Sequence, residues 1–220
     1  MPRALPARRR ILRLAWLPAL AALLPGCDEM RRPPGQGRLP AEVDPGGPDP
    51  VRGAAAAVAA AFANQGQRLA GQPEAAARAI AQFEYLYDAI GREPRFAALG
   101  ATTRTSLRLA REEIRQAVGT RPEAPAAPVI EALAQAIRAL RQRNRNGAAG
   151  ALPGTIFNPG GVPTLLRLSR PGPLPTAEQA TAQLVNEIAR LDAQGGWSGS
   201  MDRPELGIGT PLSPNLGRGV

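Results

Sequence analysis

The sequence predicts an all-α domain, and three observations support this prediction. In the region from about 54 to 193, apolar residues recur at spacings of three and four, and no segment alternates convincingly as a strand would. The region is long enough to enclose one helical core. Its connections, such as Gly71-Gln72, are short enough to make neighbouring helices antiparallel. We therefore expect about five helices, packed as antiparallel hairpins in one small bundle.

The first two helices are expected at about 54–70 and from Pro73 onward. The first is rich in alanine, although Gly66 weakens its last turn. Pro73 suits the first turn of the second helix, and Gly91 can serve as the residue that ends it. One face of this second helix carries the clearest apolar stripe of the chain, which consists of Ala76, Ala79, Ile80, Phe83, Leu86, Tyr87 and Ile90.

The third and fourth helices follow the same apolar spacing. The third is expected at about 102–118, where Gly119 ends it, and its stripe includes Leu107, Ala110, Ile114 and Val118. The fourth is expected at about 128–146, where Gly147 ends it. Arginines crowd its C-terminal half, where positive charge complements the helix dipole.

Glycine and proline then interrupt residues 147–175. Within this insertion the short apolar run 164–168 is expected to be extended and to lie over the helices. A fifth helix is expected to open at Thr176, since the spacing of Thr176 and Gln179 fits a capping box. Gly195 ends this helix.

The N-terminal residues have the composition of an export signal. Residues 1–13 contain five arginines and no acid, and such positive segments tend to stay on the cytoplasmic side of a membrane. The apolar run 14–24 that follows has eleven residues, about half of what spans a hydrocarbon core. It therefore indicates the core of a signal peptide rather than a transmembrane anchor.

The tetrapeptide Leu24-Pro25-Gly26-Cys27 resembles the lipobox of bacterial lipoprotein precursors. Leu24 matches the apolar position three before the cysteine, and Gly26 matches the small residue before it. Cys27 would carry the lipid, whereas Pro25 departs from the usual small or β-branched residue. The resemblance covers residues 1–28. An ordinary secretory peptide that is cut nearby, or a buried free cysteine, are the alternatives.

The export route has two readings. Residues 7–13 are similar to a twin-arginine export motif, with Ala7 in place of serine or threonine and Ile11 in place of phenylalanine. A merely basic start of a signal peptide explains the same residues.

The lipobox resemblance implies a protein of the bacterial envelope that is lipid-anchored on the periplasmic side. Asp28, directly after the cysteine, favours the inner membrane in enteric bacteria, and the outer membrane is the alternative. The expected organisation has four parts, which are the signal peptide (1–26), the acylated cysteine with a tether rich in Pro and Gly (27–53), the helical domain (54–193) and a flexible tail (194–220).

Composition limits the chemistry of this chain. There is no histidine, and acylation of Cys27 would leave no thiol, which excludes Ser-His-Asp and Cys-His nucleophiles and thiolate or imidazole zinc sites. Removal of residues 1–26 takes away five of the 27 arginines and none of the 18 acids, so the net charge falls from +9 to +4. All basic residues are arginine, which is typical of a GC-rich genome and weakens any argument from arginine abundance alone.

The best candidate for a binding site is a row of arginines on the third helix. Arg104, Arg108, Arg111 and Arg115 are spaced by four, three and four, so they share one face beside the apolar stripe. Only Arg108 has an acid four residues further on, Glu112, and stacking the like charges costs a few tenths of a kcal/mol per pair. Such a row suits an anionic partner, because guanidinium groups bind phosphate and carboxylate in a bidentate manner.

The candidate partners at a periplasmic membrane surface are anionic lipid headgroups or an acidic envelope protein, and nucleic acid is not expected. The alternative is structural: the arginines form a solvated flank whose stems cover the edge of the core. In that case carboxylates of other helices pair with them, and the candidates are Glu74, Glu84, Asp88 and Glu131.

Carboxylates alone offer weak support for an enzyme. Glu84 and Asp88 lie one turn apart, and Glu112 and Glu113 point about 100° apart, so the second pair does not share a site. We expect surface ion-pair partners, no enzyme and no cofactor. Trp197 either docks into a partner or packs back on the bundle.

The sequence therefore predicts a lipid-anchored binding or scaffolding module of the envelope. The alternatives are an envelope enzyme that uses carboxylates only, and a purely structural tether. The oligomeric state stays open.

Overall fold

The computed structural model describes residues 39–197, and it confirms the all-α class. Within this range the chain forms seven α-helices and two short 3-10 helices, and its only β-type pairing is an isolated antiparallel bridge between Thr120 and Phe157. The leader with its lipobox, and the chain after residue 197, lie outside the described residues. Among the described helices, none is both long and apolar enough to cross a bilayer.

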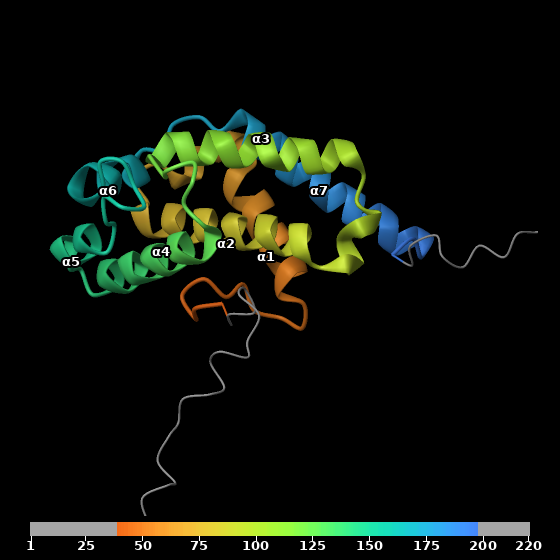
Figure 1. Cartoon of the computed structure of the whole chain (residues 1–220), viewed down its shortest axis with the longest axis horizontal. Coiled ribbons are helices and arrows are strands. Elements are labelled where there is room, and N and C mark those ends of the chain that lie inside the picture. The colour runs from red at the N-terminus through yellow and green to blue at the C-terminus, as the bar shows by residue number, and fades with distance from the viewer. Residues whose placement is uncertain (1–38, 198–220) are drawn as a thin grey trace, which may run out of the picture. The chain divides into compact units, whose positions relative to one another are not determined.

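The helices are α1 (Pro50–Phe62), η2 (Ala63–Leu69), α2 (Pro73–Arg92), η3 (Pro94–Ala98), α3 (Ala101–Val118), α4 (Ala126–Arg141), α5 (Arg145–Gly150), α6 (Gly161–Ser169) and α7 (Pro175–Gln194). Helix α2 lies at the centre and contacts α1, α3, α4 and α6, while α7 packs along α3 and α1. Figure 1 shows α5 and α6 together at one end of the domain and the C-terminal end of α7 at the other.

The core forms around the predicted apolar stripe of α2. Ile80, Phe83 and Leu86 are buried, and the ring of Phe83 meets the ring of Phe62 on α1 edge to face at a centroid distance of 6.1 Å. Because neighbours cover α2 on several sides, it also buries the polar side chains of Gln82 and Glu84. Satisfying these two groups fixes how the neighbouring segments are placed.

The folded domain begins earlier than residue 54. Asp49 accepts the backbone N–H groups of Val51 and Arg52, and this N-cap starts α1 at Pro50. Further upstream, Val43 is fully buried, and its carbonyl oxygen accepts a hydrogen bond of 2.9 Å from the side chain of Gln82. Part of the segment 27–53, which we expected to be a tether, therefore packs on the bundle.

Helix α1 ends at Phe62, eight residues before the predicted end. Asn64, Gln65 and Gly66 all have left-handed backbone angles, with φ of 52°, 57° and 74°. The carboxylate of Glu178, on α7, accepts the N–H groups of Asn64 and Gln65. A side chain 114 residues further along the chain thus stabilises a turn that local propensity disfavours.

Two other predicted helix ends are wrong. Gly91 lies inside α2, which continues to Arg92. The expected helix 128–146 is divided in two, since Arg143 takes a left-handed conformation with φ 58° and Asn144 starts α5 by accepting the N–H of Gly147.

The expectation of an extended run at 164–168 is also wrong. These residues belong to α6, which buries Leu165 and Leu168 on its inner face. In contrast, α3 and α7 end as predicted, at Gly119 and Gly195, both in the left-handed conformation.

Helix α7 begins near the expected residue but without the predicted capping box. Its first N–H groups, from Thr176 and Ala177, donate to the two carboxylate oxygens of Glu113 on α3, at 3.1 and 2.8 Å. The cap of α7 is therefore a tertiary contact with the helix that carries the arginine row.

Candidate functional site

Helix α3 carries all four arginines of the predicted row, and each of them makes a hydrogen bond to another group of the domain. Arg104 donates to the carbonyl oxygens of Leu99 and Phe96, at 3.2 and 2.5 Å, and so satisfies the C-terminal end of η3. Arg108 is exposed and pairs with Glu112 at 2.6 Å. Surface pairs of this kind contribute little to stability, and they exchange readily for another anion.

Arg111 and Arg115 share the buried carboxylate of Glu84, which lies on α2. Arg115 donates through Nε and Nη2 to the two oxygens of Glu84, at 2.6 and 2.8 Å, and Arg111 donates to one of them at 2.7 and 3.1 Å. Glu84 is 0% exposed and Arg115 is 5% exposed. The structural alternative, in which carboxylates of other helices pair with the row, therefore holds for this part of it.

Arg115 has no guanidinium nitrogen left for a partner. Its Nη1 donates to the carbonyl oxygens of Arg121 and Pro122, at 3.1 and 2.9 Å. Arg111 differs, because its Nη1 makes no hydrogen bond within residues 39–197, and its guanidinium carbon lies 4.5 Å from the centre of the Tyr87 ring. Glu84 and Tyr87 together fix the direction in which Arg111 points.

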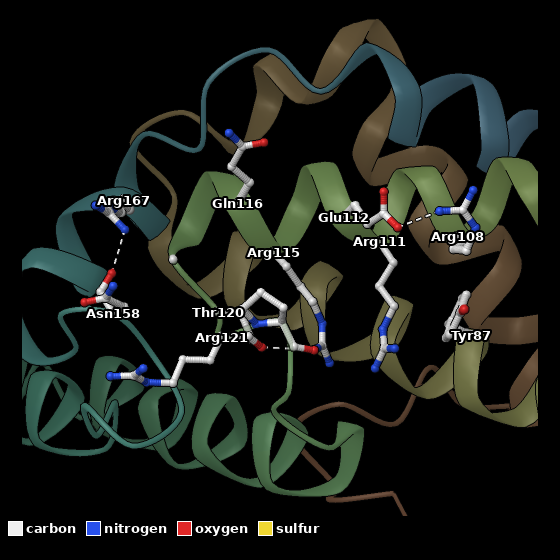
Figure 2. A pocket seen from close by; sticks show the side chains of 12 residues that line it. Tyr87, Arg108, Arg111, Glu112, Arg115, Gln116, Thr120, Arg121, Asn158 and Arg167 are labelled. Atoms are coloured by element: carbon white, nitrogen blue, oxygen red, sulfur yellow. Dashed lines mark hydrogen bonds and ion pairs between the residues drawn. The ribbon is translucent and has the colours of Figure 1, made fainter.

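A pocket of about 620 Å³ lies beside this cluster, and arginine dominates its lining. The charged residues that line it are Arg108, Arg111, Arg115, Arg121, Arg167 and Glu112. We call it the basic pocket. Figure 2 shows Arg108 and Tyr87 on one side of Arg111 and Arg115, and Arg121, Asn158 and Arg167 on the other.

The far wall of the basic pocket depends on a short backbone pairing after α3. The N–H of Asn158 donates to the carbonyl oxygen of Gly119 at 2.7 Å, and the N–H of Arg121 donates to that of Ile156 at 2.9 Å. Arg167, from α6, donates through Nη1 to the carbonyl oxygen of Asn158 at 2.8 Å. Segments that are far apart in the sequence thus meet at one rim.

Gly119 is required at this rim for two reasons. Its φ of 78° is a left-handed conformation that favours glycine. In addition, a Cβ at this position would overlap Arg167 Nη1 and the carbonyl oxygen of Asn158. The residue that ends α3 therefore also lets α6 approach.

The lining carries uncompensated positive charge. Five arginines against the single lining carboxylate of Glu112 give +4, and +2 when the buried Glu84 beneath the pocket and Glu123, which lies 3.8 Å from Arg121, are included. The hydroxyl oxygen of Thr120, a lining residue that is 5% exposed, has no hydrogen-bond partner among the described residues. A polyanion would find in this pocket both charge and hydrogen-bond donors.

The carboxylates considered for catalysis serve four separate contacts. Glu84 holds two arginines, Asp88 pairs with Arg92, and Glu112 pairs with Arg108. Glu113 caps α7. Within the described part of the chain, no group of three or more carboxylates is placed to hold a metal ion.

At the opposite end of the domain, Trp197 packs back on the bundle. Its ring meets Phe96 edge to face at 5.8 Å, Arg52 lies over it at 5.1 Å, and its Nε1 donates to Asp192 at 2.6 Å. This answers the question that the sequence left open about this side chain.

The carboxylates at this end have lowered pKa values. The hydrogen bond from Arg52, with a second from Trp197, lowers the pKa of Asp192 to about 2. Burial raises the pKa of Asp49, but hydrogen bonds from Arg95 and from the N–H groups of Arg52 and Val51 outweigh it, so that the pKa lies below its usual value.

Sequence reasoning found three of the five pocket arginines and missed Arg121 and Arg167. Arg121 lies two residues after Gly119, so a rim position was foreseeable from the predicted end of α3. Arg167 was not foreseeable, because the segment that carries it did not show a helical period.

The fold and the site together define a small all-helical domain with a cationic pocket. No family model matches this chain, and comparisons with curated proteins and with solved structures give no significant match.

Proposed function

We propose that this protein is a lipid-anchored binding module of the bacterial envelope, and that its basic pocket takes an anionic group with phosphate or carboxylate chemistry. The observation that carries the proposal is the lining of the pocket, where five arginines meet one exposed carboxylate in a space of about 620 Å³. A volume of this size suits a small ligand or the charged end of a larger one.

The arginines that face the ligand are held in place before it arrives. Glu84 and Tyr87 orient Arg111, and backbone carbonyl oxygens orient Arg121 and Arg167. Carbonyl oxygens satisfy donors without cancelling the charge, so the attraction for an anion persists. Preorganised donors bind more tightly, because less side-chain entropy is lost on binding.

The proposed envelope location follows from the leader. The arginine-rich start, the apolar run of eleven residues and the lipobox-like tetrapeptide that ends in Cys27 together support export and acylation. A binding role fits a chain that has no histidine and no cysteine other than Cys27.

The pocket is tested by calorimetric titration of the full chain with inorganic pyrophosphate at low ionic strength. Arg108→Gln and Arg167→Gln change two lining residues without removing the buried pairs of Glu84. Each change should weaken binding about tenfold or more, because a hydrogen bond to a charged group contributes about 1.5–3 kcal/mol.

The matched control is Arg68→Gln, at an exposed arginine of η2 that does not line the basic pocket. It should leave binding unchanged within twofold. Absence of pyrophosphate binding by the wild-type chain, or equal losses in all three variants, contradicts the proposed pocket.

Acylation is tested separately in a bacterial host. A palmitate analogue should label the wild-type chain and should not label Cys27→Ala. Labelling of both proteins, or of neither, contradicts the assignment of the lipobox.

A further inference from the structure

One end of the domain has positive charge without any acid. Residues 132–177 contain six arginines and no aspartate or glutamate. They form most of α4, all of α5 and α6, and the start of α7, and Figure 1 shows α5 and α6 side by side at one end of the domain.

Four of these six arginines have no carboxylate partner within residues 39–197. Arg138 and Arg141 pair with acids outside the segment. The remaining four are exposed and lie in or next to α5 and α6, and they are Arg143, Arg145, Arg167 and Arg170. Their charge is available to an outside partner.

Exposed aliphatic side chains lie among these arginines. Val162 and Leu166 are each 57% exposed, and their spacing of four puts them on the outer face of α6, opposite the buried Leu165 and Leu168. The described residues include one other large hydrophobic side chain of comparable exposure, Leu109 on α3, at 43%. Helix α6 therefore has two apolar faces, one that packs on the core and one that is exposed to solvent.

We propose that α6 docks on the surface of an anionic bilayer. Val162 and Leu166 enter the boundary between headgroups and acyl chains, and the four unpaired arginines contact the headgroups. Apolar side chains combined with basic residues are the two contributions by which a helix binds in the plane of a membrane interface. This inference rests on the proposed envelope location, and it does not depend on a ligand in the basic pocket.

A bilayer fits this surface better than an acidic protein does. A stable protein interface buries about 800 Å² on each partner around a packed apolar centre. Two aliphatic side chains on an exposed helix do not supply such a centre, whereas a bilayer takes in single side chains and presents headgroup charge across its whole surface.

The experiment uses the full chain with Cys27→Ser, which has no other cysteine. A single cysteine is introduced by Leu166→Cys or, as the matched control, by Leu109→Cys, and an environment-sensitive fluorophore is attached. Each protein is mixed with vesicles of phosphatidylcholine, with or without an equal share of phosphatidylglycerol. Both proteins keep the leader, so any vesicle binding by the leader itself is common to both.

The label at position 166 should shift to the blue and gain intensity with phosphatidylglycerol vesicles only, while the label at 109 stays unchanged. Adding Arg143→Gln and Arg170→Gln to the 166 protein should lower its vesicle partition about fivefold each, because one arginine near an anionic surface contributes about 1 kcal/mol. Unchanged circular dichroism melting curves show that the variants are folded.

The proposal is overturned if the fluorescence of the label at 166 does not respond to phosphatidylglycerol vesicles, or if the label at 109 responds equally. It is also overturned if the label at 166 responds to an acidic protein and not to the vesicles. The outcomes for the pocket stay distinguishable. Pyrophosphate binding without a response at 166 retains the pocket and removes the docking helix, and the reverse result retains the docking helix alone.

Discussion

A single buried carboxylate holds together the two arginines at the floor of the basic pocket. Glu84 accepts four hydrogen bonds from Arg111 and Arg115, and it is completely buried. Because burial of an isolated charge is costly, each member of this cluster requires the others. The cluster therefore stabilises the packing of α3 on α2 and the floor of the basic pocket at the same time.

Glu84→Gln should lower the free energy of unfolding by about 3–5 kcal/mol, because it leaves the buried guanidinium of Arg115 without its counter-charge. Urea unfolding followed by circular dichroism measures the change. Glu123→Gln, at a side chain that is 71% exposed, is the control and should stay within about 0.5 kcal/mol of the wild type. Equal stability of the two variants would refute this role of Glu84.

Gly119→Ala tests whether the rim of the basic pocket needs a residue without a side chain at this position, where Arg167 of α6 and the carbonyl oxygen of Asn158 come close. The left-handed backbone alone should cost about 1–2 kcal/mol. Gly195→Ala is the matched control, because Gly195 also ends a helix with a left-handed φ, of 61°, but has open space around a Cβ.

Gly119→Ala should therefore destabilise the domain more than Gly195→Ala does, and only Gly119→Ala should weaken pyrophosphate binding. Thermal unfolding and calorimetric titration measure the two effects. Equal losses of stability in both variants, with pyrophosphate binding intact, would show that the position of Arg167 does not depend on a glycine at position 119.

At the scale of the elements, α3 and α7 depend on one another. The carboxylate of Glu113 accepts hydrogen bonds from two N–H groups at the start of α7. Its negative charge also stabilises this end of the helix, which carries the positive end of the helix dipole. Glu113 therefore contacts α7, while Glu112 and Arg111, its neighbours on α3, line the basic pocket.

Glu113→Gln should lower the free energy of unfolding by about 1 kcal/mol, because the amide loses the charge and can accept on only one of its two terminal atoms. The adjacent Glu112→Gln provides the control, since its side chain is 62% exposed and pairs only with exposed Arg108. Chemical unfolding of both variants measures the difference. A loss in Glu112→Gln that matches the loss in Glu113→Gln would contradict the cap.

The elements with a long apolar period were predictable from the sequence. Such a period places α2, α3 and α7 correctly, and glycines mark the ends of the last two. In contrast, α6 has only nine residues, with Pro163 in its first turn, so its apolar run is too short to show a period. The arginine row was predictable as a face of α3, and Glu84 was one of four carboxylates named as candidate partners. The sequence could not single it out, because Glu84 lies on another helix and no local spacing relates it to the row.

The whole molecule is polarised along its length. The end formed by α5 and α6 has no acid, whereas the other end joins arginines to Asp49, Glu93, Glu187 and Asp192. Ion pairs at that acidic end make the stability of the domain depend on pH, because the pKa values of Asp49 and Asp192 are lowered in the folded state.

A lowered folded pKa means that the unfolded chain binds more protons in acid, so stability is lost as pH falls. For Asp192 the window runs from the unfolded value of about 4 down to the folded value of about 2. The melting temperature should therefore fall over this window, and Asp192→Asn should make the fall shallower. A melting curve series by circular dichroism checks this, and an identical pH dependence in the variant would argue against the pair with Arg52.

The contact between Trp197 and Phe96 also determines where the rest of the chain leaves the domain. Trp197, the last described residue, lies against Phe96 of η3, at the end of the domain that lies opposite α5 and α6 (Figure 1). An affinity tag or fluorescent protein fused directly after Trp197 would be attached away from both the basic pocket and the proposed docking helix. This end is therefore the suitable attachment point for reporters that must leave ligand and membrane access undisturbed.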